Sequence, residues 1–113
     1  MSSRDRGEVW LVDLGYTAKV RPCLIISIPA LEQDRALATL IPHTTSSRGS
    51  RFEVALKVNF LRSGVFDVQN ILTIPHAKLL RKLGDLIPQQ LVEVEKVLLS
   101  WLGLEGRDFD SDE

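Results

Sequence analysis

The sequence predicts a small, mainly β domain, either a small barrel or a strongly bent sheet, with one C-terminal helix. Runs of strand length, rich in β-branched and aromatic residues, follow one another at short intervals. A helical spacing of apolar residues occurs after Pro88. Helices between the strands, which a doubly wound α/β fold requires, are missing from the pattern.

The expected strands are short and lie close together in the chain. They cover residues 8–14, 23–28, 36–42, 51–57 and 65–74. The second should be buried, because both of its faces are apolar. The third should stop at Pro42, since proline cannot donate a hydrogen bond to a sheet. Residues 43–50 contain no apolar side chain and should form a polar loop before the alternating fourth strand.

One helix should follow the strands. Pro88 suits a first helical turn, and apolar residues recur behind it at spacings of three, four and three. These residues are Leu91, Val94, Leu98 and Trp101. Val97 and Leu102 widen the same face, and Gly103 provides a stop. A helix of about 14 residues should therefore pack onto the sheet through this apolar face.

The length of 113 residues fits one domain, which we expect to span residues 1–104. Residues 1–86 carry 12 Lys+Arg and 8 Asp+Glu, whereas residues 87–113 carry 2 and 7. A basic body is compatible with an anionic ligand. Residues 105–113 are expected to form a flexible acidic tail.

Several classes of protein are not expected from this sequence. It has one cysteine, no apolar leader, and no apolar stretch near the ~20 residues of a membrane span, so we expect a cytoplasmic protein. Cys23, His43 and His76 lack paired ligand spacing, so no metal site is expected, and Cys23 is interpreted as a small core residue. The absence of a glycine-rich phosphate loop argues against a nucleotide cofactor.

Two segments carry groups suited to phosphate binding. Arg21 precedes Pro22 at the start of a strand, where its planar fork of donors would point in a fixed direction. The alternative is an ordinary ion pair, for example with Asp13. The loop His43-Thr44-Thr45-Ser46-Ser47-Arg48 combines hydroxyl groups, backbone amides and a cation, which suits phosphate oxygens. Its alternative interpretation is a plain polar hairpin loop.

Taken together, these segments resemble the MazF/PemK family of toxin–antitoxin endoribonucleases, also called mRNA interferases. The family's first strand reads "RGDVWLVDL", its second "RPvlvlS", and its third and fourth "vPxTts…G…fevxl". The similar segments, in the same order, are residues 6–14 (RGEVWLVDL), 21–27 (RPCLIIS), 41–49 (IPHTTSSRG), 52–54 (FEV) and 81–86 (RKLGDL). The resemblance covers roughly residues 6–104.

The resemblance implies an SH3-like small barrel of the CcdB/PemK type and a homodimer with an RNA groove at its interface. It implies cleavage of single-stranded mRNA at specific sequences without a metal ion. The substrate's 2′-hydroxyl would attack the neighbouring phosphate, leaving a 2′,3′-cyclic phosphate and a 5′-hydroxyl. Arg21 and Thr44 match the family's catalytic arginine and threonine. The residues expected to contact RNA are Lys19, Thr45, Ser46, Arg48, Gln69 and Asn70.

The resemblance also implies a protein partner, a cognate antitoxin. We expect the antitoxin to lay an acidic-hydrophobic peptide over the basic groove and so compete with RNA. The resemblance further implies that the free toxin inhibits growth and that the toxin–antitoxin complex binds DNA.

The chain departs from the family pattern in two places. Gln69-Asn70 stand where many relatives have Asp-Gln, and glutamine cannot act as a carboxylate base. The connection over residues 15–20 is short and lacks the glutamate that relatives often carry there. Asp67 and His43 are therefore the candidate bases. Two alternatives stay open: a catalytically weakened relative that binds RNA or protein, and the gyrase-poisoning branch of the fold, against which Arg21 and Thr44 argue.

Overall fold

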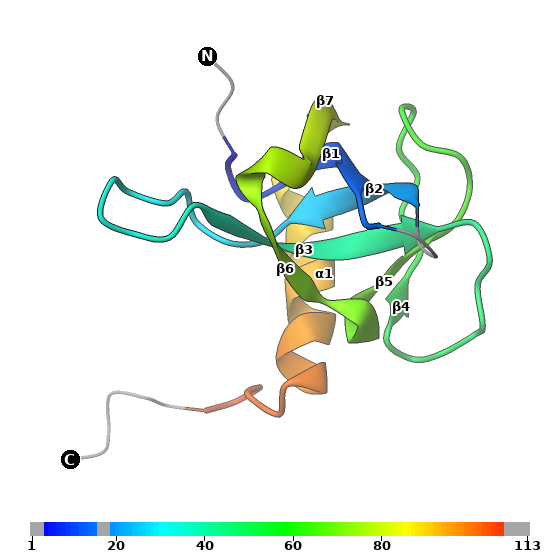
Figure 1. Cartoon of the computed structure of the whole chain (residues 1–113). Helices are drawn as coiled ribbons and strands as arrows, with labels where there is room; N and C mark the ends of the chain where they lie inside the picture. Colours follow the sequence, from blue (N-terminus) through cyan, green and yellow to red (C-terminus); the bar gives the residue numbers. More distant parts are fainter. Residues whose placement is uncertain (1–3, 16–18, 108–113) are drawn as a thin grey trace.

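The computed structural model describes residues 4–15 and 19–107. Within these residues the chain forms seven strands, two 3₁₀ helices and one α-helix (Figure 1). In chain order they are β1 Glu8–Asp13, β2 Val20–Ile25, β3 Leu37–Thr44, β4 Glu53–Val54, β5 Val65–Asp67, η1 Val68–Asn70, β6 Leu72–Pro75, η2 His76–Lys78, β7 Leu79–Asp85 and α1 Pro88–Trp101. The expectation of a flexible tail falls largely on residues 108–113, which lie outside the described residues.

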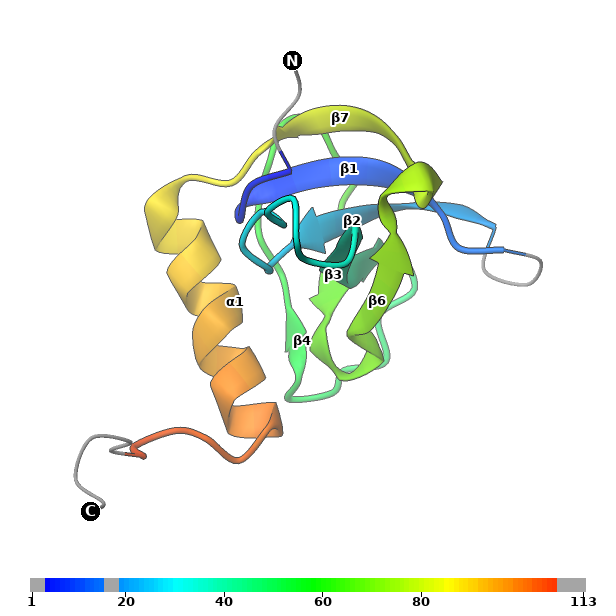
Figure 2. The same cartoon turned by 60° about the vertical axis from the view of Figure 1, so that its left-hand side comes forward.

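The strands form one antiparallel sheet in the order β4-β5-β3-β2-β1-β7, with β6 also paired to β3. Strand β3 changes its partner along its length: its first half pairs with β6 and its last two residues pair with β5. The sheet is therefore strongly bent, and α1 lies across one of its faces (Figure 2). The predicted fold class, a mainly β, barrel-like fold with a C-terminal helix, is confirmed, although the sheet is not closed.

The core has two parts, one on each face of the sheet. Val9, Leu24 and Ile41 point toward α1 and pack around Val94 of that helix. The alternate residues, represented by Trp10 and Cys23, form a second cluster on the opposite face. Because neighbouring side chains of a strand point to opposite faces, this double core explains why Cys23-Leu24-Ile25 is apolar without interruption.

Two predicted strand boundaries were wrong. The second strand is Val20–Ile25 and not 23–28; Ile28 is 75% exposed and lies beyond it. The third strand continues through Pro42 to Thr44. Pro42 lies where β3 exchanges β6 for β5, and a proline is tolerated in a strand where no ladder hydrogen bond is required of its nitrogen. The polar loop consequently begins at Thr45.

The later strands differ more from the expectation. The fourth consists of Glu53–Val54 alone, and the extended segment over 65–74 is interrupted by η1. Strand β7 was not predicted as a strand. It is an edge strand with exposed Leu80, Arg81 and Lys82, and its pairing with β1 is irregular. An edge strand of this kind shows no clear alternation of apolar and polar residues, which explains why the sequence pattern did not reveal it.

The predicted helix is confirmed, including its length of 14 residues and Pro88 in its first turn. Val94 is fully buried, while Leu102 is 49% exposed and does not widen the packed face as expected. The predicted stop is also confirmed. Gly103 adopts a φ of 71°, its N–H donates to Ser100 O, and the N–H of Leu104 donates to Leu99 O, which together form a Schellman motif.

Cys23 lies in the second core cluster, fully buried, as expected for a small core residue. Burial raises the pKa of its thiol to about 12. At pH 8 only about one thiol in 10,000 is then ionised, and the thiolate is the reactive form.

We therefore expect iodoacetamide to leave the Cys23 thiol of the native protein unlabelled and to label it once guanidinium chloride unfolds the protein. Mass spectrometry reads this cleanly because the chain has one cysteine; rapid labelling of the native state would contradict the buried position.

No helix among the described residues is both long enough and apolar enough to cross a membrane.

Candidate active site

The pairing of β2 with β3 brings together the two residues to which the sequence assigned catalysis. The observed register pairs Ile25 with Leu40, Leu24 with Ile41 and Cys23 with Pro42. Continued by two residues, the same antiparallel register sets Arg21 opposite Thr44. Directly opposite residues of antiparallel strands share a face, with Cβ atoms about 4.5–5.5 Å apart. The two side chains therefore start from neighbouring points.

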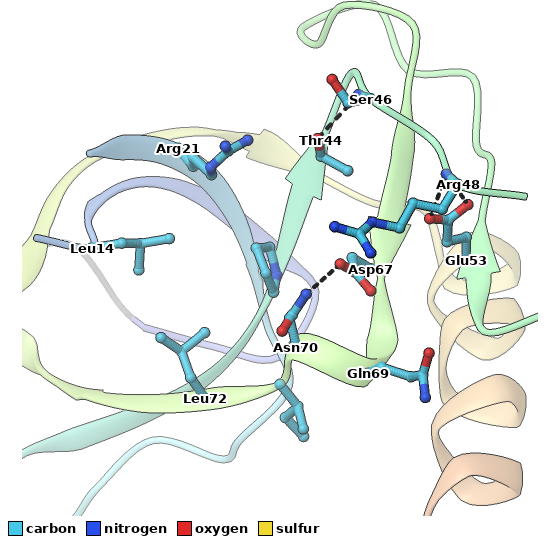
Figure 3. Close-up of a pocket in the computed structure, with 12 residues that line it drawn as sticks. Leu14, Arg21, Thr44, Ser46, Arg48, Glu53, Asp67, Gln69, Asn70 and Leu72 are labelled. Carbon is cyan, nitrogen blue, oxygen red and sulfur yellow. Dashed lines mark hydrogen bonds between the residues drawn. The ribbon is translucent and has the colours of Figure 1, made fainter. Parts of the chain in front are cut away.

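Both side chains line one open pocket of about 600 Å³ (Figure 3). Strands β2 and β3, the loop after β3, and the segment from β5 to the start of β6 form its walls. The lining residues are Leu14, Arg21, Pro42, Thr44, Ser46, Arg48, Glu53, Asp67, Gln69, Asn70, Ile71 and Leu72. Two arginines and two carboxylates thus face a space that also has apolar walls.

The Arg21 side chain is half-buried, and its guanidinium makes no hydrogen bond or ion pair with any residue that the structure describes. The alternative of an ion pair with Asp13 is not observed. Asp13 instead lies 4.0 Å from the Lys78 ammonium and accepts a hydrogen bond from the Gly15 N–H. The donors of Arg21 are accordingly available to an anion in the pocket.

Thr44 is the last residue of β3, and its side chain is held by the loop that follows. The Ser46 N–H donates a hydrogen bond of 3.0 Å to Thr44 Oγ1. A hydroxyl group that accepts from an amide still has its own proton to donate. Thr44 therefore presents an oriented donor to the same space as Arg21.

Residues 45–52 connect β3 to β4, and Glu53 of β4 holds the loop formed by residues 45–50 of this connection. Its carboxylate accepts hydrogen bonds from Ser47 Oγ (2.7 Å) and from the N–H groups of Arg48 and Gly49 (both 3.0 Å). These hydrogen bonds, above all that from Arg48, hold the pKa of Glu53 below its ordinary value. The group stays ionised, and holds the loop, until the pH falls below the ordinary range of a glutamate.

Two of the expected RNA contacts come from this loop. Ser46 and Arg48 line the pocket, and the Arg48 side chain extends into it (Figure 3). Thr45 is exposed and does not line the pocket, and neither does Lys19, the residue before β2. Tyr16–Ala18, which belong to the short connection before Lys19, lie outside the described residues.

The wall opposite Arg21 contains acceptors. Asp67, Gln69 and Asn70 all line the pocket, and the Asn70 amide donates a hydrogen bond of 2.5 Å to Asp67 Oδ2. Asp67 is also the cross-strand partner of Glu53. Gln69 lies within the 3₁₀ turn η1, which follows Asp67 directly, and its amide points away from Arg21 in Figure 3.

His43, the second candidate base, lies on the other face of β3. It is 4% exposed, does not line the pocket, and packs edge-on against Phe66 with ring centroids 5.0 Å apart. Burial lowers the pKa of His43 and favours its neutral form. The structure therefore does not bring His43 to the pocket, because strand alternation directs residues 43 and 44 to opposite faces.

Sequence reasoning missed Glu53 as a residue of the pocket. The alternation Phe52, Glu53, Val54 indicated only the solvent side of a half-buried strand. The available signal was the run Ser47-Arg48-Gly49 a few residues earlier, since a glycine-containing polar turn offers free amides to a nearby carboxylate. No group of three or more potential metal ligands occurs within residues 4–15 and 19–107.

The pocket on this bent sheet combines arginine, hydroxyl and amide groups, the types of group that proteins use to contact phosphate oxygens. The family model described as "PemK-like, MazF-like toxin of type II toxin-antitoxin system" matches residues 5–102. The chain therefore belongs to the PemK-like, MazF-like toxins of type II toxin–antitoxin systems.

Individual relatives agree with the family. The chain is 32% identical over 104 residues to endoribonuclease MazF1 of Mycobacterium bovis, an alignment that covers 92% of this chain and 97% of that protein. It is 27% identical over 108 residues to a probable endoribonuclease MazF of Mycolicibacterium smegmatis, covering 89% and 98%.

Solved structures are similar along nearly the whole chain. A mycobacterial endoribonuclease in complex with its cognate antitoxin has a TM-score of 0.78 and 29% identity, covering 91% of this chain and 98% of that one. A MazE–MazF complex from Deinococcus radiodurans has a TM-score of 0.77 and 25% identity, covering 93% and 100%. These relatives favour the toxin assignment over a weakened binding module or a gyrase poison.

Proposed function

We propose that this toxin is an endoribonuclease that cleaves single-stranded RNA in the pocket between β2, β3 and β5, with Arg21 and Thr44 as catalytic residues. The endoribonuclease relatives support the activity. The observation that carries the assignment of residues is that Arg21 and Thr44 line one pocket, each two residues beyond the paired Cys23 and Pro42, with the Arg21 guanidinium unpaired among the described residues.

The chemistry requires little covalent participation from the protein. The nucleophile belongs to the substrate, so the site must orient the 2′-hydroxyl and stabilise negative charge on a five-coordinate phosphorus. Arg21 and the Thr44 hydroxyl are suited to donate hydrogen bonds to the phosphate oxygens, and Arg48 adds a second cation.

Asp67 is the carboxylate best placed to act as base. It lines the pocket and accepts one hydrogen bond, from the Asn70 amide to Oδ2, whereas the other lining carboxylate, Glu53, accepts several hydrogen bonds from the loop. In the proposed step the 2′-oxygen gives its proton to Asp67 and bonds to phosphorus. The bond to the 5′-oxygen then breaks, and that oxygen takes a proton from solvent. The products are a 2′,3′-cyclic phosphate and a 5′-hydroxyl.

The assembly and its location are part of the same proposal. Relatives of similar fold were solved with an antitoxin, and an acidic-hydrophobic antitoxin segment would complement the arginines of this pocket. We further propose that the toxin works as a homodimer in the cytoplasm, where mRNA is found.

The test of the function is a cleavage assay on a long single-stranded RNA in the presence of EDTA. We expect fragments that end in 2′,3′-cyclic phosphate and begin with 5′-hydroxyl, cut at a short recurring sequence. Intact RNA that is nevertheless bound would contradict the proposed activity and favour the binding-module alternative.

Replacing Thr44 with valine should lower cleavage at least about tenfold, because valine keeps the shape of the side chain but cannot donate to the phosphate. The measurement is kcat/KM on single-stranded RNA, with thermal unfolding as a check of the fold. Thr73→Val, which removes a hydroxyl that bonds Thr39 on the exposed β3–β6 pair, is the matched control and should leave cleavage unchanged. Equal activity of the two variants would exclude Thr44 from the mechanism.

A further inference from the structure

Several hydrogen-bond donors of the loop of residues 45–50 converge on the side chain of Glu53. Glu53 Oε1 accepts the Ser47 hydroxyl at 2.7 Å and the Gly49 N–H at 3.0 Å, and the Arg48 N–H lies 3.2 Å from Oε1 and 3.0 Å from Oε2. Ser47 Oγ in turn accepts from the Gly49 N–H at 3.2 Å. Two backbone amides and one hydroxyl group therefore converge on a single carboxylate.

The same loop has few other attachments. Its residues 45–49 are exposed. Its other hydrogen bonds lie at its two ends: Ser46 bonds to Thr44 at the beginning, and Ser50 accepts from the N–H groups of Phe52 and Glu53 at the end. Among the described residues, none outside positions 44–53 makes a hydrogen bond to residues 45–50. The shape of the middle of the loop, residues 47–49, therefore depends on the Glu53 side chain.

The shape of the loop decides where the side chains of Ser46 and Arg48 point. Ser46 and Arg48 both line the pocket. Arg48 donates its backbone N–H to Glu53, and its side chain reaches into the pocket (Figure 3). Arg21 and Thr44, by contrast, belong to the strands β2 and β3, where Arg21 pairs with Val12 of β1 and Thr44 with Val65 of β5. One part of the pocket is held by the sheet and the other by Glu53.

We propose that Glu53 is a positioning residue of the RNA site, which acts by holding residues 45–50 so that Ser46 and Arg48 face the bound RNA. The inference rests on the proposed function. A carboxylate suits the task because it only accepts hydrogen bonds, and all the loop groups that face it are donors. A glutamine would turn an NH₂ group toward some of these donors and leave them unpaired.

The effect on the reaction follows from this division of the pocket. A released loop must be ordered when RNA binds, which weakens binding. The catalytic pair on β2 and β3 keeps its backbone position, and the Ser46 N–H that holds the Thr44 hydroxyl group comes before the groups of the loop that Glu53 holds. Glu53→Gln should therefore raise KM for single-stranded RNA about tenfold and change kcat by less than about threefold.

The matched control is Asp34→Asn. Asp34 Oδ2 accepts the Leu31 N–H at 2.9 Å in another exposed turn, and Asp34 does not line the pocket. This control makes the same carboxylate-to-amide change in a turn that has no part in the site, and it should leave KM and kcat unchanged.

The experiment measures amide hydrogen exchange by NMR in the free protein, and KM and kcat with a long single-stranded RNA. In Glu53→Gln the amides of Arg48 and Gly49 should exchange at least about tenfold faster, with Leu24 of the core unchanged. Faster loop exchange together with a higher KM supports the proposal. Faster exchange with an unchanged KM overturns it, and so does unchanged exchange.

A second variant keeps the test valid if Glu53→Gln does not fold. Ser47→Ala removes one of the donors to Glu53 and leaves the carboxylate in place. It should shift loop exchange and KM in the same direction by a smaller factor, and an unchanged KM with faster exchange would again overturn the proposal. Failure of the proposed function is distinguishable, because it would appear as intact RNA with the unsubstituted protein, and an error in the assigned catalytic residues would appear as full cleavage by an Arg21→Ala variant.

Discussion

Replacing Arg21 with alanine should lower RNA cleavage by about 100- to 1000-fold, the usual effect of removing one donor that stabilises transition-state charge. The guanidinium lies at the pocket beside Thr44 and has no partner among the described residues, so its loss removes charge stabilisation and little packing. The measurement is kcat/KM on single-stranded RNA in EDTA. Circular dichroism and thermal unfolding should show a folded protein of nearly unchanged stability.

Two further variants sharpen this result. Arg21→Lys keeps the charge but not the planar fork, so it should recover only part of the activity. Arg35→Ala removes an exposed arginine that does not line the pocket, and it should cleave RNA normally. An Arg21→Ala protein that cleaves as well as the Arg35→Ala control would show that Arg21 is not catalytic. An unfolded Arg21→Ala protein would show that its role is structural.

Replacing Gly64 with alanine should destabilise the fold by about 1–3 kcal/mol and reduce cleavage as well. A Cβ atom at position 64 would lie 2.2 Å from the Thr44 carbonyl oxygen and 2.8 Å from the His43 ring. A backbone oxygen cannot move aside as a flexible side chain can, so the end of β3 must shift. That shift displaces Thr44 from its position opposite Arg21.

The measurements are urea unfolding and kcat/KM of the same sample. Ser63→Ala, which changes the exposed neighbour in the same turn, is the control and should differ little from the natural protein. If Gly64→Ala were as stable and as active as this control, the close packing of Gly64 against β3 would be wrong. A stable but inactive variant would show that the position of Thr44 matters more for the reaction than for folding.

Secondary-structure elements were predicted correctly where consecutive residues carry the whole signal, and wrongly where pairing with a distant strand decides the outcome. The helix Pro88–Trp101 was predicted nearly to the residue, because its start, apolar spacing and stop are all written in consecutive residues. Strand β7 was missed, because an exposed edge strand pairs on one side only and its pattern carries no burial signal. The predicted end of β3 at Pro42 was wrong, because a proline ends a strand only where its nitrogen is required to donate a hydrogen bond to a neighbouring strand.

The residues of the site also divide into those that the sequence predicted and those that only the folded structure revealed. Arg21, Thr44, Ser46, Arg48, Gln69 and Asn70 were expected together from the resemblance, Asp67 was expected as a candidate base where the chain departs from the family pattern, and all seven line one pocket. Lys19 and Thr45 were expected with them and do not line it, and His43 turns into the protein interior. Glu53 was not expected there, because its importance comes from loop amides that only the folded loop brings to it.

Hydrophobic periodicity and turn residues act between near neighbours, so the amino-acid order alone determined the mainly β class, the single helix and the two polar segments that carry the chemistry. Tertiary structure decided which of those polar groups meet. The antiparallel register of β2 and β3 sets Arg21 across from Thr44, alternation along β3 turns His43 away, and β4 brings Glu53 under the loop. These relations join residues far apart in the chain, and only pairing of the strands in space creates them.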